Sequence, residues 1–275
     1  MVLSRLREQK KEKTIYKMNH KWNYQPPSQE QTEAAKALAK ETGINPVLCK
    51  LLLERGITSA AEAKRFFRPQ LSELHDPFLM KDMSIAVERL NQAMGKKERI
   101  LVYGDYDVDG TTAVALVYKF LQQFYSNIDY YIPDRYNEGY GVSVKGIDFI
   151  ICDHHVPDDV LPPAVAILNA KRPDATYPYE HLSGCGVGFK FMQAFALNNG
   201  IEFNQLTPLL DLVAVSVASD IVPIMGENRV LTYHGLKQLN SNPSVGLKAI
   251  IDICGLSEKE ITVGDIVFKI GPRIN

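Results

Sequence analysis

Two patterns of hydrophobic and polar residues divide the chain near residue 99. Before that point, polar stretches rich in helix-favouring residues alternate with short turns. Ser28 is placed to cap the first such stretch and Gly43 to end it. The pattern therefore predicts a small helical lead-in, with helices over residues 29–42, 47–55, 60–67 and 85–94.

After Arg99, short apolar runs alternate with longer apolar stretches. The short runs are typical of strands buried on both faces and occupy residues 100–103, 128–132, 149–152 and 164–168. The longer stretches predict helices over residues 113–124, 189–197 and 209–219. Strands that alternate with helices predict an α/β fold with a parallel sheet. In such sheets ligands lie beyond the carboxyl ends of the strands.

The composition is that of an ordinary globular protein, with 45% hydrophobic residues, 23% charged residues and a net charge of −1. No apolar run reaches the roughly 18 residues that a membrane span needs. Residues 1–21 are basic but contain no apolar segment, which excludes a secretory signal and predicts a flexible extension, with a nucleic-acid-binding tail as the alternative. The four cysteines are scattered, so we expect reduced thiols in a cytoplasmic protein.

Three carboxylates crowd the segment after the first predicted strand. Asp105, Asp107 and Asp109 lie in a predicted polar loop from Gly104 to Gly110, directly before a helix. Because their negative charges repel one another, a buried position at the end of a strand favours a bound cation. Oxygen ligands favour Mg²⁺ or Mn²⁺. The alternatives are an exposed acidic turn and a loose calcium loop.

Two more polar groups follow apolar segments. Asp153, His154 and His155 come directly after a predicted strand. Imidazole binds Mn²⁺ and other transition metals, and a neighbouring carboxylate can bind the metal or orient a ring. Asp220 ends a long apolar helix, where the helix dipole disfavours a carboxylate and a metal would compensate. The alternatives are a solvated histidine loop and a plain turn aspartate.

Weaker signals indicate a phosphate site. Gly184 and Gly186 precede an apolar helix, where backbone N–H groups can face a phosphate, although tight packing of a helix start is the alternative. Arg273 near the end of the chain can bind a phosphate through its forked guanidinium.

At these residues the sequence resembles the DHH phosphoesterase superfamily, whose name is the triplet seen here as Asp153, His154 and His155. Within it, the chain is similar to the RecJ-type single-stranded-DNA-specific exonucleases from about Trp22 to Asn275. The stretches that carry the resemblance are GDYDVDGTTA, YIPDRYNEGYG, NAKRPD, ASDIVP and GPRIN.

This resemblance implies a parallel-sheet DHH catalytic domain over residues 81–275, a helical lead-in over residues 22–80 and an extension over residues 1–21. It also implies hydrolysis of single-stranded DNA from 5′ to 3′ in DNA repair and recombination, with two Mn²⁺ or Mg²⁺ ions. A single-strand-binding protein and a RecQ-type helicase are further partners that it implies, with no role for a membrane.

Together, the residue-level reasoning and the resemblance predict three overlapping sets of site residues. The catalytic set is Asp107, Asp109, His154 and His155. The metal set is Asp105, Asp107, Asp109, Asp153, His154 and Asp220. The phosphate-binding set is His155, Gly184, Gly186 and Arg273.

Two features depart from the family pattern. The family carries an Asp-Cys-Gly segment before the DHH strand, with an aspartate that bridges the two ions, and no such segment occurs here. We therefore expect a strand and most of a helix to be missing near residues 149–150, and the C-terminal DHHA1 and oligonucleotide-binding domains to be absent. A trimmed sequence and a real deletion both explain this. A chain that lacks the bridging carboxylate is expected to be nearly inactive.

Two other functions stay open. One is a DHH phosphodiesterase that acts on short oligonucleotides or cyclic dinucleotides, although such enzymes usually lack the helical lead-in and the GDYDVDG motif. The other is a non-catalytic DHH scaffold that binds DNA or replication proteins. The intact carboxylates and histidine argue against the scaffold, and the missing aspartate segment argues for it.

Overall fold

The computed structural model describes residues 26–134 and 147–275. The chain divides into two compact units, Met1–Ala63 and Lys64–Asn275. The predicted basic extension and most of the YIPDRYNEGYG stretch lie outside the described residues. Within the described ranges, no helix combines the length and hydrophobicity that a membrane crossing requires.

The lead-in helices form as the sequence predicts. Helix α1 (Gln29–Thr42) begins with a capping box, in which the Ser28 hydroxyl accepts the Gln31 N–H and the Gln31 side chain accepts the Ser28 N–H. It ends at Gly43, which adopts a left-handed conformation with φ of 71°. Helices α2 (Pro46–Leu53) and α3 (Ala60–Phe67) follow.

The four predicted strands are present and parallel, but they form two separate pairs. Strand β1 (Ile100–Tyr103) pairs with β2 (Ile128–Tyr131), and β3 (Ile150–Cys152) pairs with β4 (Ala166–Leu168). We expected one sheet. Among the described residues no strand joins the two pairs.

One arginine links the starts of the two strand pairs. Arg89 donates to Glu98, which precedes β1, at 2.5 Å and to Asp148, which precedes β3, at 2.8 Å. Both strand pairs therefore begin within reach of the same guanidinium group. The predicted site residues follow the opposite, carboxyl ends of β1 and β3.

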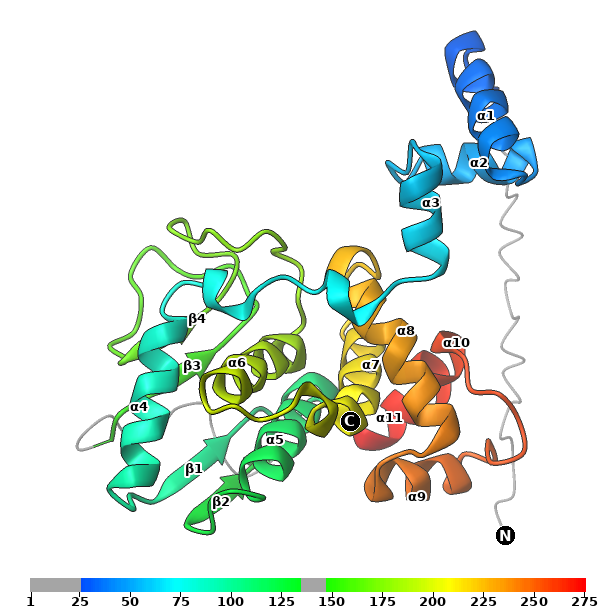
Figure 1. Cartoon of the computed structure of the whole chain (residues 1–275). Coiled ribbons are helices and arrows are strands. Elements are labelled where there is room, and N and C mark those ends of the chain that lie inside the picture. The colour runs from blue at the N-terminus through cyan, green and yellow to red at the C-terminus, as the bar shows by residue number, and fades with distance from the viewer. Residues whose placement is uncertain (1–25, 135–146) are drawn as a thin grey trace, which may run out of the picture. The chain divides into compact units, whose positions relative to one another are not determined.

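Helices cover the strands on the side visible in Figure 1. Helix α5 (Val108–Leu121) packs on β1 and β2, α4 (Met83–Gly95) on β4, and α6 (Gly184–Asn198) on β3. Helix α5 begins at Val108 and not at residue 113, because the Asp107 carboxylate caps it by accepting the Gly110 N–H at 2.7 Å. The segment that we expected to be a loop up to Gly110 is therefore partly helical.

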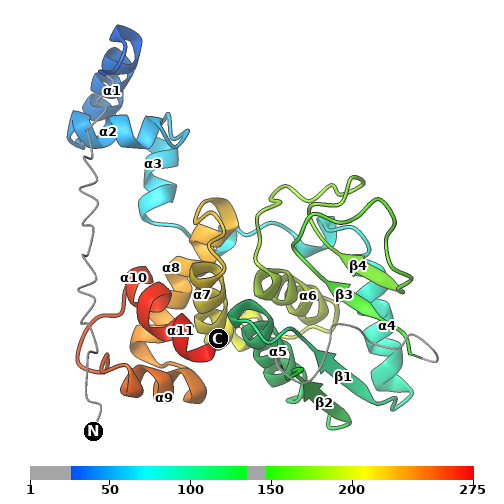
Figure 2. The same ribbon diagram turned by 180° about the vertical axis from the view of Figure 1, so that it is seen from behind.

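The core lies where α5, α6 and α7 (Leu210–Ser219) meet, and α7 is buried from Leu210 to Ala218. Helix α8 (Gly226–Ser241) packs on α7, and the C-terminal elements follow, as Figure 2 shows from behind. These are α9 (Val245–Ile253), α10 (Val263–Asp265), a π-helical turn (Ile266–Ile270) and α11 (Gly271–Ile274). Short 3-10 turns lie at Leu71–Glu73, Pro77–Leu79, Phe203–Gln205 and Thr207–Leu209.

Candidate metal centre

Three of the predicted site residues meet, although they come from different elements. Asp109 lies in the first turn of α5, His154 follows β3, and Asp220 ends α7. One ligand atom from each lies within 4.8 Å of the others. The His154 Nε2 atom is 3.4 Å from Asp109 Oδ2, and its Nδ1 atom is 3.6 Å from Asp220 Oδ2.

Asp109 is 6% exposed, and its carboxylate is held by three donors. The N–H of Gly184 donates to Oδ2 at 2.7 Å, and the N–H of Cys185 donates to Oδ1 at 2.8 Å. The Ser216 hydroxyl donates to Oδ1 at 2.5 Å. The start of α6 and the middle of α7 therefore fix this side chain.

Asp220 has a different environment. Burial raises the pKa of its carboxyl, the negative charge of Asp109 raises it further, and His154 opposes the change. No hydrogen bond to this carboxylate is found among the described residues. A cation at this point would relieve both the burial and the repulsion.

The other two acidic residues of the GDYDVDG stretch face local partners. Asp107 caps α5, and its charge also raises the pKa of Asp220, which places it near the cluster. Asp105 accepts the N–H of Tyr106 at 2.6 Å. Gly110 allows this turn to close, because a Cβ there would lie 2.5 Å from the Asp105 carbonyl oxygen.

Asp153 lies beside the cluster and orients His155. Its Oδ1 atom accepts the N–H groups of His154 and His155 and lies 2.8 Å from His155 Nδ1. This contact raises the pKa of the His155 imidazole, whose side chain is 76% exposed. The carbonyl of His155 in turn accepts a hydrogen bond from Asn169 at 2.8 Å.

In the structure, the N–H groups that we predicted to face a phosphate bond within the protein. The N–H of Gly184 donates to Asp109, and the N–H of Gly186 donates to the Ser183 hydroxyl at 3.1 Å. These groups serve the protein itself, so they are not available to a phosphate. Arg273 is exposed and donates to the Lys269 carbonyl at 3.0 Å, and its contact with a phosphate stays a prediction.

The cluster has the chemistry of a divalent metal site. Two carboxylates and an imidazole are ligands that Mn²⁺ accepts. The His154 Nδ1 atom is buried and has no hydrogen-bond partner among the described residues. A buried nitrogen without a partner is costly, and a metal or a bound water would satisfy it.

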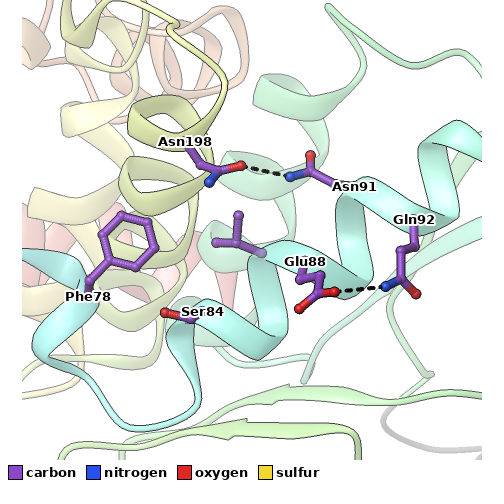
Figure 3. A pocket seen from close by; sticks show the side chains of 7 residues that line it. Phe78, Ser84, Glu88, Asn91, Gln92 and Asn198 are labelled. Atoms are coloured by element: carbon purple, nitrogen blue, oxygen red, sulfur yellow. Dashed lines mark hydrogen bonds between the residues drawn. The ribbon is translucent and has the colours of Figure 1, made fainter.

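A surface hollow is lined by residues outside this cluster. It has a volume of about 510 Å³ and lies along α4, opposite the end of α6. Figure 3 shows its amide lining, in which Asn91 donates to Asn198 and Gln92 donates to Glu88. It contains none of the predicted site residues, so it does not change the assignment of the site.

Comparison with known proteins identifies the protein family. Residues 99–217 match the model of the DHH family, N-terminal domain, and this segment includes Asp109 and His154. The chain belongs to the DHH family. Within that family, it is homologous to the N-terminal part of RecJ.

The single-stranded-DNA-specific exonuclease RecJ of Bacillus subtilis (strain 168) is 34% identical over 287 aligned positions, which cover 93% of this chain and 35% of the relative. RecJ of Escherichia coli (strain K12) is 32% identical over 84% of this chain and 47% of the relative. The chain therefore spans less than half of either relative. The 287 positions also exceed the 275 residues of this chain, so the first relative has residues inside the matched region that have no counterpart here.

Solved structures also support homology to RecJ. RecJ from Thermus thermophilus in complex with Mn²⁺ matches 90% of this chain and 38% of its own length, with a TM-score of 0.72 and 25% identity. An exonuclease RecJ bound to manganese matches 75% of this chain and 58% of its own length, with a TM-score of 0.65 and 28% identity.

Two serines of the site were missed by the sequence analysis. Ser216 and Ser183 are fully buried and lie behind Asp109. The sequence does contain one signal for this contact, because Ser216 places a hydroxyl in the middle of an otherwise apolar helix. A buried hydroxyl needs a hydrogen-bond partner, and that partner is a carboxylate of the site.

Proposed function

We propose that this chain carries the phosphodiester-hydrolysing centre of a RecJ-like exonuclease that degrades single-stranded DNA from the 5′ end with Mn²⁺ or Mg²⁺. The observation that carries the proposal is the convergence of Asp109, His154 and Asp220 in a chain homologous to the N-terminal part of RecJ. Asp107, Asp105 and Asp153 are proposed as further ligands or as residues that orient them.

Asp109, His154 and Asp220 would hold a divalent ion here, which would supply Lewis-acid polarisation of a phosphoryl oxygen and a more acidic bound water. The chain supplies the anionic groups that hold this ion, Asp109 and Asp220, and the buried imidazole of His154. His155 is exposed and oriented by Asp153, and its raised pKa keeps it positively charged over a wider pH range. That charge suits contact with the phosphate of a DNA strand.

We further propose that the chain works slowly, because it has no Asp-Cys-Gly segment. The longer alignment with the Bacillus relative supports a missing internal segment, and the two separate strand pairs agree with it. One aspartate fewer leaves less negative charge to hold a second ion.

The experiment combines metal binding with hydrolysis. Mn²⁺ binding to the 275-residue chain is measured by calorimetry, and an excess of the chain is then incubated with a 5′-phosphorylated single strand labelled at its 3′ end. We expect weak Mn²⁺ binding and slow, Mn²⁺-dependent release of nucleotides from the 5′ end. Asp109→Asn and His154→Ala should abolish both, whereas Glu88→Gln, an exposed carboxylate on α4, should change neither.

Three outcomes separate this function from the alternatives. Cleavage of dinucleotides or cyclic dinucleotides in preference to long strands would support a small-substrate phosphodiesterase. DNA binding without any Mn²⁺ binding would support a scaffold. Full-rate digestion of 5′-ended strands would show that the chain does not need the missing segment.

A further inference from the structure

We propose that the first turn of α6 and the hydroxyl of Ser216 position Asp109 so that only its Oδ2 atom faces the metal. The N–H groups of Gly184 and Cys185 thus serve a proposed metal ligand. This inference rests on the proposed metal-binding role of Asp109, and it names Gly184, Ser183 and Ser216 as positioning residues.

The two oxygens of Asp109 are engaged unequally. Oδ1 accepts two hydrogen bonds, from Cys185 N at 2.8 Å and Ser216 Oγ at 2.5 Å. Oδ2 accepts one, from Gly184 N at 2.7 Å, and it is the oxygen that faces His154 Nε2. Since a carboxylate oxygen has two lone pairs, Oδ1 is fully used and Oδ2 keeps one free on the side of the cluster.

The serines extend this contact into an ordered chain of hydrogen bonds. The hydroxyl oxygens of Ser216 and Ser183 lie 2.6 Å apart. A carboxylate can only accept, so the single proton of Ser216 goes to Asp109 and the proton of Ser183 goes to Ser216. Ser183 Oγ in turn accepts the N–H of Gly186 at 3.1 Å. Both serines are 0% exposed, and hydrogen bonds in such a low-dielectric setting reinforce one another.

Steric constraints require a glycine at position 184. A Cβ on this residue would lie 2.4 Å from Asp109 Oδ2, far inside contact distance. Any side chain would push the carboxylate away from the helix start and out of line with His154. Gly188 lies one turn further along the same helix, and a Cβ there would meet Val117 Cγ2 at an ordinary 3.4 Å.

The first test compares these two glycines. Mn²⁺ binding to the whole chain is measured by calorimetry and by the electron paramagnetic resonance signal of free Mn²⁺. We expect Gly184→Ala to lower the affinity by about tenfold or more, because groups that support metal ligands contribute about 10- to 100-fold to affinity. Gly188→Ala should bind like the unmodified chain.

The second test removes one hydroxyl. Ser216→Ala deletes a single donor, and we expect it to weaken Mn²⁺ binding by about tenfold. Val217→Ala is the matched control, because Val217 is the next residue of α7, is 0% exposed and has no side-chain hydrogen-bond donor for Asp109. It should lower the melting temperature without changing the affinity for Mn²⁺.

The outcomes separate this inference from the proposed function. If the unmodified chain binds no Mn²⁺, the proposed function is wrong and the positioning role with it. If the chain binds Mn²⁺ through Asp109 and His154 but Ser216→Ala and Gly184→Ala bind equally well, only the positioning role is wrong. If Gly184→Ala does not fold, Ser216→Ala alone decides.

Discussion

The buried pair of Lys190 and Glu227 offers a test of what holds α6 and α8 together. Lys190 Nζ lies 3.2 Å from Glu227 Oε1, and the two side chains are 0% and 1% exposed. Glu227 also accepts the N–H of His75 at 2.9 Å and the hydroxyl of Tyr177 at 2.6 Å. Lys190 donates in addition to the His75 carbonyl at 2.6 Å. One acidic group therefore joins α6, α8 and two loop segments.

The magnitude follows from the distance and the burial. Two unit charges 3.2 Å apart attract by about 5 kcal/mol at an effective dielectric constant of about 20, and the loss of hydration on burial offsets much of that gain. Removing one partner leaves the other buried without compensation, which costs about 3–5 kcal/mol. We therefore expect Lys190→Met and Glu227→Gln each to lower the free energy of unfolding by about 3 kcal/mol or more. Burial lowers the pKa of Lys190, so loss of its proton limits the cost in Glu227→Gln.

The assay is urea unfolding at pH 7 of the unmodified chain, the two single variants and the double variant. The single tryptophan, Trp22, lies outside the Lys64–Asn275 unit, so circular dichroism is the appropriate signal. The double variant should lose much less than the sum of the two single losses, with a coupling energy of about 2 kcal/mol or more. Additive losses within about 0.5 kcal/mol would refute the reasoning, because the two charges would then be independent.

Two further predictions concern single residues in α7 and α8. Burial raises the pKa of Asp211 above its ordinary value of 3.8, although N–H groups of Ser244 and Leu212 oppose the shift, so the stability that this group contributes is full below pH 3.8 and is lost as the pH rises through its folded pKa. The stability of Asp211→Asn relative to the unmodified chain should therefore increase between pH 3 and pH 7 in urea titrations, and parallel curves would contradict this. Gly235→Ala places a Cβ 2.2 Å from the Leu210 carbonyl oxygen and should cost about 3 kcal/mol, measured by the same unfolding assay, whereas Gly246→Ala, with open space around it, should cost little.

The sequence predicted those elements whose signals are local. The capping residues of α1 and the apolar runs of β1 to β4 lie within a few residues of the elements that they define. The start of α5 was missed because aspartates at every second position indicated a loop. The middle aspartate, Asp107, is in fact the N-cap of the helix. The division of the strands into two pairs depends on the partner of each strand, which periodicity does not contain.

In the candidate site, too, residues with a local sequence signal were predicted, and contacts between residues distant in sequence were not. Asp109 and His154 were predicted because each follows a strand, and parallel topology brings the carboxyl ends of strands to one edge. Asp220 was predicted because it ends an apolar helix, where the helix dipole disfavours a carboxylate. The partners of Gly184 and Ser216 were not predicted, because each bonds to Asp109 across 75 and 107 residues of sequence. The Lys190–Glu227 pair was missed for the same reason.

Comparing Asp220 with three buried acids of the Lys64–Asn275 unit supports a metal at this cluster. Glu227 is compensated by Lys190 and by two further donors, and Asp211 by two backbone N–H groups. Asp109 has three donors. Asp220 has no hydrogen-bond donor among the described residues, and its neighbour His154 keeps a buried ring nitrogen without a partner. Of these four acids, only Asp220 lacks a hydrogen-bond donor among the described residues, and a divalent cation would coordinate both this carboxylate and the neighbouring imidazole.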